Sequence, residues 1–408
     1  MQQPPVNLPL PPPLMMSEVG SFAHLTLMQR LPAIARRVIA ENDFPESIRE
    51  NLERLIQELP AGKVRSLKDD QGADLTAWAS YLTPFLGKSW LEIPWFFAEA
   101  YFYRRILEAT HYFLPGESQG LDPFALQKHR GLETAMASIR AMCDRLNTHL
   151  NQPRTEDKTS LIALLYFALW GNRADLSLWP LEGEDANPSR QKIEGEVTHI
   201  LVDDTSLIAD KITSGQRGRI DVIVDNAGFE LICDLCLADF LLTTQAAEIV
   251  YLHLKPHPTF VSDAMIEDVQ HTVRVLAADH DQAVQLLAQR LQDYLATGRL
   301  CLHDDLFWTS PLAFWEMPEA LQQKLAPSSL ILSKGDANYR RCLGDRQWSF
   351  TTTFQEIVSY FPAPLAALRT LKSELAVGLK QSQLEALWQE DPHWLTNGQW
   401  GVIQFVSK

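Results

Sequence analysis

Cysteine is scarce in this chain: five are present among 408 residues, an odd number at scattered positions. Domains held together by disulfides need a denser, even set, so such a framework is excluded and a reducing compartment is expected. One C-x-x-C pair, Cys233 and Cys236, has no second pair and lies in a stretch predicted to be helical. We therefore predict that both pack in the core and that zinc is not the bound metal.

Long apolar runs and an excess of positive charge are also missing. No stretch reaches the roughly 18 consecutive apolar residues of a membrane helix, and the first residues lack a signal-peptide pattern. Lys and Arg number 36 against 51 Asp and Glu, which gives a net charge of −15. A field of this sign repels nucleic acid and anionic lipid. We therefore expect no nucleic-acid or membrane partner and a cytoplasmic location.

The composition, with 46% hydrophobic and 21% charged residues, is typical of a globular protein. At about 150 residues per domain, the length predicts two or three domains. Six of the first 13 residues are proline. We expect residues 1–16 to form an extended, disordered tail outside the fold, with docking onto an aromatic groove as the alternative.

Residues 17–195 are predicted to form a helical domain that ends in a linker. Apolar residues recur there at spacings of three and four, the period of an amphipathic helix. The expected helices cover residues 25–39, 48–59, 95–108, 132–150 and 159–170. Residues 180–196 are rich in Pro, Gly, Asn and charge, so we place the domain boundary there.

From residue 196 to 408 short β-branched runs alternate with helical stretches. The pairs are residues 199–203 with 205–212, 220–225 with 228–242, 249–254 with 263–278, and 330–333 with 337–343. Alternating strands and helices predict an α/β domain: an α/β/α sandwich around a mainly parallel open sheet. Ligands bind such sheets at the carboxyl ends of the strands.

Polar residues follow two of the predicted strands. Asp225 and Asn226 end one strand, and Asp263 follows the next. If these strands are neighbours, two carboxylates and an amide oxygen meet, a set that suits Mg²⁺ or Mn²⁺ and also Co²⁺ or Ni²⁺. Glu230, one helical turn further on, would hold a metal-bound water or one of these ligands without itself contacting the metal. The alternative for each Asp is a simple helix cap.

Basic residues cluster near the end of a later strand. Lys334, Arg340 and Arg341 surround Asp336, and Lys372 follows another apolar run. Cations beside a carboxylate-bound metal favour a phosphoryl ligand, although surface ion pairs are the alternative.

Four ordered motifs resemble the metal-dependent damage-control phosphatases. They are Asp225-Asn226-Ala227-Gly228-Phe229-Glu230, Phe260-Val261-Ser262-Asp263, Lys334-Gly335-Asp336-Ala337-Asn338-Tyr339-Arg340-Arg341 and Arg369-Thr370-Leu371-Lys372. The last resembles the R-T-x-K signature of one subfamily, and the similarity covers roughly residues 20 to 408. Some relatives in that subfamily are described as methyltransferases of protein carboxylates.

The resemblance implies a divalent metal on Asp225, Asn226 and Asp263. It implies a small phosphate-ester substrate, such as fructose 1-phosphate or fructose 6-phosphate. The implied substrate contacts are Asp225, Asn226, Glu230, Asp336, Ala337, Asn338, Tyr339, Arg340 and Lys372. Asp225, Asp336 and Lys372 would be catalytic. Either water or Asp225 would attack the phosphorus, Asp336 would orient the water or move a proton, and Lys372 and Arg340 would stabilise the charge.

Two other functions stay open. A methyltransferase would need a glycine-rich turn for S-adenosylmethionine, and the nearest candidate, residues 215–218, precedes a strand and is basic. A non-catalytic scaffold would use the helical domain as its surface. In that domain Trp95, Phe96, Tyr101 and Tyr103 are expected to pack in the core. Asn172, Arg173 and Asp175 are candidates for a lid or specificity wall.

Overall fold

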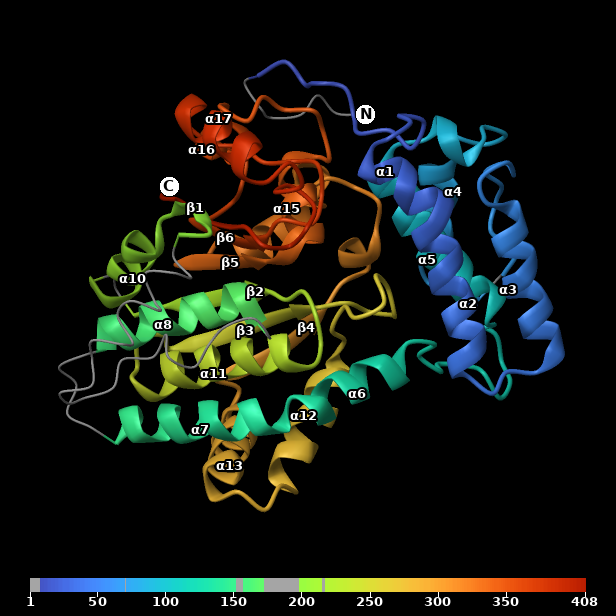
Figure 1. Cartoon of the computed structure of the whole chain (residues 1–408). Coiled ribbons are helices and arrows are strands. Elements are labelled where there is room, and N and C mark those ends of the chain that lie inside the picture. Colours follow the sequence, from blue (N-terminus) through green and yellow to red (C-terminus); the bar gives the residue numbers. More distant parts are fainter. Residues whose placement is uncertain (1–7, 70, 152–156, 172–197, 215–216) are drawn as a thin grey trace.

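The computed structural model describes residues 8–69, 71–151, 157–171, 198–214 and 217–408 (Figure 1). Within these residues one seven-stranded sheet has the order β1-β7-β6-β5-β2-β3-β4. The strands are β1 (Ile200–Asp203), β2 (Arg219–Ile223), β3 (Ile249–Leu254), β4 (Leu300–Asp304), β5 (Leu330–Lys334), β6 (Leu365–Thr370) and β7 (Gly401–Val406).

Strands β2 to β6 run parallel to one another. β2 pairs with β3 and β5, β3 pairs with β4, and β5 pairs with β6, each time in parallel. β7 is antiparallel to β6 and parallel to β1. The predicted mainly parallel α/β/α sandwich is therefore confirmed, and the carboxyl ends of β2 to β6 meet at one edge of the sheet.

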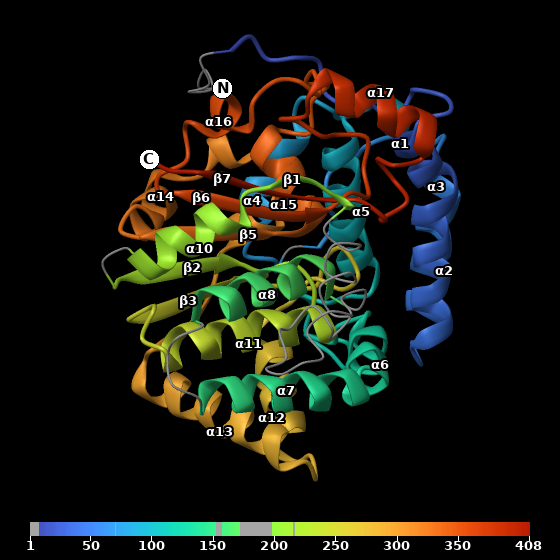
Figure 2. The same cartoon turned by 60° about the vertical axis from the view of Figure 1, so that its left-hand side comes forward.

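Helices cover both faces of the sheet (Figure 2). Successive residues of a strand point to opposite faces, so Val222 and Val224 belong to one core and Ile223 to the other. The first core contains α7 (Met136–Leu150), α8 (Asp157–Trp170), α10 (Thr205–Ser214), α11 (Phe229–Thr243), α12 (Ile266–Ala277) and α13 (Gln282–Thr297). The second contains α14 (Glu319–Leu325), α15 (Gly335–Leu343), α16 (Phe354–Val358) and α17 (Gln381–Glu390).

The first helices of the chain gather to one side of the sheet and share the second core (Figure 1). They are α1 (Phe22–Leu25), the π-helix η1 (Thr26–Arg30), α2 (Leu31–Glu41), α3 (Glu46–Glu58), α4 (Leu75–Leu82) and α5 (Trp95–Ala109). The helix α6 (Ala125–Thr134) follows, and short 3₁₀ turns lie at η2 (Trp90–Glu92), η5 (Leu306–Thr309) and η6 (Phe314–Glu316). No helix of the described part is long and apolar enough to cross a membrane.

The structure does not divide at the domain boundary expected near residue 195. Helices α7 and α8 precede that boundary but share a core with the sheet, because α7 packs on α13 and α8 packs on α11. Helix α8 has buried residues around most of its circumference, among them Leu161, Leu164 and Phe167. A helix that is apolar all round is normally enclosed by its neighbours.

The proline-rich segment also differs from expectation over residues 8–16. Leu14 and Met16 are buried, and the Leu14 N–H donates to the Asp345 carbonyl at 2.9 Å. The Trp95 N–H donates to the Leu14 carbonyl, also at 2.9 Å. The segment thus joins α5 to the end of α15, because Leu14 and Met16 pack in the second core, which local composition does not reveal.

Candidate functional site

The candidate site lies where β2, β3, β5 and β6 end side by side. Asp225 and Asn226 follow β2, and Asp263 follows β3. Asn226 and Asp263 are bridge partners, and the Ala264 N–H donates to the Asp225 carbonyl at 2.8 Å. The structure therefore brings the three predicted ligands together, as neighbouring parallel strands require.

Asn226 connects the acidic side chains of the site. Its Nδ2 donates to Asp225 Oδ2 at 2.8 Å and to Glu230 Oε2 at 2.9 Å. Its Oδ1 accepts a hydrogen bond from Ser262 Oγ at 2.6 Å. Glu230 stands in the first turn of α11, whose N-cap is Gly228. The amide thus fixes the relative positions of both carboxylates.

Asp263 is buried beside a lysine that sequence analysis did not single out. Lys255 Nζ lies 3.2 Å from Asp263 Oδ2 and 3.3 Å from the Val224 carbonyl. Both side chains are almost completely enclosed. A lysine one residue after a strand resembles an ordinary strand end, so only its position beside Asp263 gives it significance.

The carboxylates crowd one another electrostatically. Burial raises the pKa of Asp225 well above its ordinary value, and the charges of Glu230 and Asp263 raise it further, against Lys255 and Lys372. Burial likewise raises the pKa of Asp263, with Lys255 opposing. A divalent cation among these oxygens would remove the repulsion.

The donor set fits a hard cation. In the described part of the chain, no three Asp, Glu, His or Cys side chains gather as a metal-binding group. The predicted set contains two carboxylates and the Asn226 amide oxygen, and to bind a cation beside Asp225 the amide would have to turn over, because Nδ2 now faces Asp225 and Oδ1 faces Ser262. Oxygen donors of this kind are those that Mg²⁺ and Mn²⁺ use.

Asp336 anchors the segment that carries Lys372. Its Oδ1 accepts hydrogen bonds from Arg369 Nε at 2.8 Å, Ser373 Oγ at 2.9 Å and the Lys372 N–H at 3.3 Å. Burial opposes its ionisation, but the charges of Arg369 and Arg340 and these hydrogen bonds hold its pKa below the usual value. The Lys372 side chain itself is exposed, and its positive charge lowers the pKa of Asp225 against the effect of burial.

Gly335 allows α15 to begin against Asp225. Its φ is 84°, and a Cβ there would lie 1.9 Å from Asp225 Oδ2. Both the left-handed backbone and the close approach require glycine.

Three comparisons place this chain among known proteins. The sequence profile of the damage-control phosphatase ARMT1-like domain matches residues 26–387. Damage-control phosphatase ARMT1 of Danio rerio is 34% identical over 430 residues, which cover 95% of each chain. The Homo sapiens protein of that name is 33% identical over 436 residues, 97% of this chain and 98% of its own. The chain belongs to the ARMT1-like damage-control phosphatase family.

The family resemblance inferred from the motifs is therefore confirmed. A solved structure of a DUF89 family protein from Pyrococcus horikoshii shares 14% identity with a TM-score of 0.45. That similarity covers 85% of this chain and 90% of the other.

Several residues of the ARMT1-like motif on α15 do not face the ligand set. Arg340 is buried, donates to Glu99 at 2.5 Å and to Asp345 at 2.7 and 3.0 Å, and stacks on Trp95. Its guanidinium therefore joins α15 to α5, in place of the predicted phosphate contact. Arg341 is also buried, donating to carbonyls of residues 307, 308 and 312, and is not a surface ion pair.

The other buried side chains of this motif likewise make structural contacts. Asn338 Nδ2 donates to the Lys334 carbonyl at 2.8 Å, and Tyr339 Oη donates to Gln404 Oε1 at 2.7 Å. Ala337 is half-buried in the first turn of α15. Lys334 pairs with Asp234 at 2.7 Å and lies 3.9 Å from Glu230. These contacts fix the helix that presents Asp336.

Sequence reasoning missed Lys255 and Ser262 and gave Arg369 no role of its own. Arg369 is fully buried and donates to Asp336, Ser373 and the Leu375 carbonyl. Its place in the R-T-x-K motif was the feature of the sequence that could have identified it.

The remaining predictions fall partly outside the described residues. Cys233 and Cys236 are buried in α11, as predicted, and so are the four aromatic residues of α5. The lid candidates Asn172, Arg173 and Asp175 lie outside the described residues, but Gly171 directly before them lies beside Glu230. Of the predicted glycine-rich turn, residues 215–216 are also outside, and Gly218 lies at the amino end of β2, opposite Asp225.

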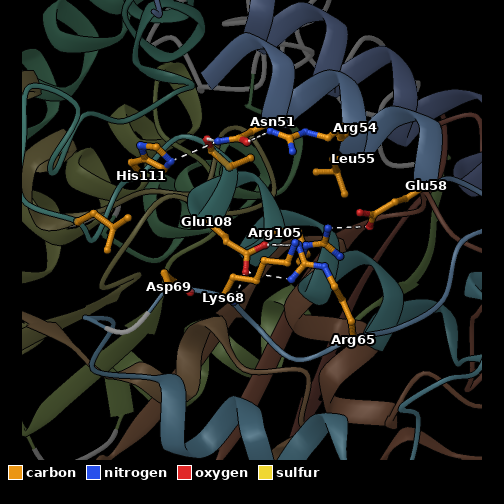
Figure 3. A pocket seen from close by; sticks show the side chains of 12 residues that line it. Asn51, Arg54, Leu55, Glu58, Arg65, Lys68, Asp69, Arg105, Glu108 and His111 are labelled. Carbon is orange, nitrogen blue, oxygen red and sulfur yellow. Dashed lines mark hydrogen bonds and ion pairs between the residues drawn. The ribbon is translucent and has the colours of Figure 1, made fainter. Parts of the chain in front are cut away.

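A charged cavity of about 240 Å³ lies elsewhere, between α3, α5 and residues 65–69 (Figure 3). Arg105 donates to Glu58 at 2.7 Å and to Glu108 at 3.0 Å, while Arg65 donates to Glu108 at 2.6 Å. The carboxylates Glu58 and Glu108 are thus paired with guanidinium groups. This cavity has none of the predicted site residues.

Proposed function

We propose that this chain is a metal-dependent phosphatase that hydrolyses phosphate monoesters of sugars or related metabolites. The observation that carries the proposal is the meeting of Asp225, Asn226 and Asp263 at one sheet edge, with Lys372 following β6 at the same edge. Membership of the damage-control phosphatase family supports the same reaction class. Fructose 1-phosphate and fructose 6-phosphate are the substrates we propose to test first.

Asp225, Asp263 and the Asn226 amide oxygen would hold the divalent cation, for which Mn²⁺, Mg²⁺, Co²⁺ and Ni²⁺ are the candidates. When bound, the cation supplies positive charge that polarises a phosphoryl oxygen. The Ser262 hydroxyl, which can donate or accept a hydrogen bond, would hold the Asn226 amide in either orientation. Lys255 offsets part of the negative charge of Asp263.

Lys372 is the cation available to the phosphoryl group. Its side chain is exposed, and its backbone is held by Asp336, whose pKa is low. In-line attack by water breaks the ester P–O bond, forms a bond from phosphorus to the water oxygen, and passes a water proton to the leaving alcohol. If Asp225 attacks first, water must then hydrolyse the aspartyl-phosphate to release phosphate and restore the carboxylate, and borohydride trapping of that intermediate separates the two routes.

The test is phosphate release from an aryl phosphate, measured with purified protein, with chelator, and after adding back each metal. We expect activity that chelation abolishes and Mn²⁺ or Co²⁺ restores. Asp225→Asn should abolish it while the thermal unfolding transition remains cooperative. Lys372→Ala should lower kcat about a hundredfold, whereas Lys380→Ala, another exposed lysine, should not change it.

A panel of phosphometabolites then identifies the substrate. Activity that persists in chelator, or survives Asp225→Asn, would contradict the metal-dependent mechanism. Absence of phosphatase activity, together with a melting shift on adding S-adenosylmethionine, would favour the methyltransferase.

A further inference from the structure

The turn that delivers Asp263 contains two non-glycine residues with left-handed backbone. Phe260 has φ 45° and Val261 has φ 68°. The Ser262 N–H donates to the Phe260 carbonyl at 2.8 Å, which makes residues 260–262 a γ-turn with positive φ at its centre. This form of γ-turn is rare and strained, and a β-branched residue is especially unfavourable in it. Such strain persists only where surrounding contacts hold it.

Helix α5 provides those contacts on one side of the turn. The Phe260 ring packs against Phe96, with centroids 5.6 Å apart, and against Tyr103, with centroids 4.9 Å apart. Phe96 and Tyr103 are seven residues apart, so they lie on one face of the helix. The helix itself is fixed to α15 through the Arg340 hydrogen bonds.

Backbone pairing holds the turn on its other side. The Ala227 N–H donates to the Ser262 carbonyl at 2.7 Å, and the Lys255 N–H donates to the Ala264 carbonyl at 2.9 Å. Ser262 Oγ also holds the Asn226 amide oxygen. Val261 therefore links Phe260 to Ser262 and Asp263, and Ser262 in turn contacts Asn226.

We propose that Phe96, Tyr103 and Phe260 form an aromatic clamp by which the helical region keeps this strained turn in the conformation that positions Asp263 and Asn226. Phe260 is a positioning residue: it acts through the turn on the proposed metal donors. The inference rests on the proposed function and gives the helical region a part in it. Released from the clamp, Val261 would relax to negative φ and move Ser262 and Asp263 apart from Asn226.

The test compares Mn²⁺ binding by wild type, Phe260→Ala and Phe260→Tyr. Loss of a group that orients a ligand weakens metal binding about 10- to 100-fold, and we expect this for Phe260→Ala. Phe260→Tyr keeps the ring and should bind as wild type does. In the metal-free protein, hydrogen exchange at the Ser262 and Ala264 amides should speed up in Phe260→Ala alone.

Two further variants separate positioning from loss of packing. Glycine adopts positive φ without strain, so adding Val261→Gly to Phe260→Ala should restore most of the Mn²⁺ affinity. Phe85 is also half-buried and packs on α5 through Phe97, with centroids 4.3 Å apart. Phe85→Ala should lower thermal stability but leave Mn²⁺ affinity unchanged.

Unchanged Mn²⁺ affinity in Phe260→Ala would overturn the inference, and so would failure of Val261→Gly to restore it. A wild-type protein that neither binds Mn²⁺ nor releases phosphate would contradict the proposed function instead. The hydrogen-exchange comparison would then still test whether the clamp holds the turn.

Discussion

Gly335 stands directly against the Asp225 carboxylate at the start of α15. The Gly335→Ala variant would place a methyl group where Asp225 Oδ2 now lies and would displace the carboxylate. We expect phosphatase activity to fall about a hundredfold, the cost of misplacing a reacting or ligand group by an ångström. The measurement is kcat/KM for the aryl phosphate at saturating Mn²⁺.

Gly298→Ala is the matched control, because Gly298 has φ 71° but no atom near its missing Cβ. Gly298→Ala should lose about 1 to 2 kcal/mol of unfolding free energy from left-handed alanine, and Gly335→Ala should lose more because its methyl group also overlaps Asp225. Equal activities in the two variants would mean that contact with Asp225 is unimportant.

At the residue scale, the sequence predicted that Asp225, Asn226 and Asp263 lie together, but it did not predict that Arg340 and Arg341 are buried. Asp225, Asn226 and Asp263 follow strands, so the topology alone predicts that they meet. Arg340 lies on a helix near Asp336 in the sequence, but its partner Glu99 is 241 residues away. A basic residue facing a substrate and one buried in a distant ion pair have the same local pattern, so only tertiary packing separates them.

At the scale of elements, prediction succeeded for β1, β2, β3 and β5. Residues 249–254 were predicted as a strand and form β3, and the predictions for β2 and β5 differ by one or two residues at their ends. These strands are largely buried, and most of their residues are apolar. The edge strand β4 was missed because its last two residues, His303 and Asp304, are polar. Strand β7 was also missed, because Gln404 interrupts its apolar pattern.

The ion-pair network between α3, α5 and residues 65–69 supplies a prediction at the same scale. Glu108→Gln would remove the shared partner of Arg65 and Arg105 and leave both guanidinium groups partly uncompensated. We expect a loss of about 3 kcal/mol in unfolding free energy, typical of breaking a buried pair. Chemical denaturation measures it.

The exposed pair Lys158–Asp210 serves as the control for that experiment. Asp210→Asn should cost less than about 1 kcal/mol. If the two variants are equally stable, the network in Figure 3 contributes no more than a surface ion pair.

For the whole molecule, residues 8–16 join the helical region to the end of α15. Met16 is fully buried, whereas Val19, three residues later, is 84% exposed. We expect Met16→Ala to lower the unfolding free energy by about 2 to 4 kcal/mol. Val19→Ala should stay within about 0.5 kcal/mol of wild type. Urea denaturation of both variants checks this, and equal midpoints would show that the segment adds no stability.

The place of β7 between β1 and β6 has a consequence for the order of events on the ribosome. Arg369 and Thr370 pair with Val402 and Gly401, so the strand that leads to Lys372 has a bare edge until residues 401–406 emerge. Unpaired strand edges in nascent chains invite aggregation. Most of the strands therefore leave the ribosome before the partner that covers this edge of β6, and during that interval the edge is open to pairing with other chains.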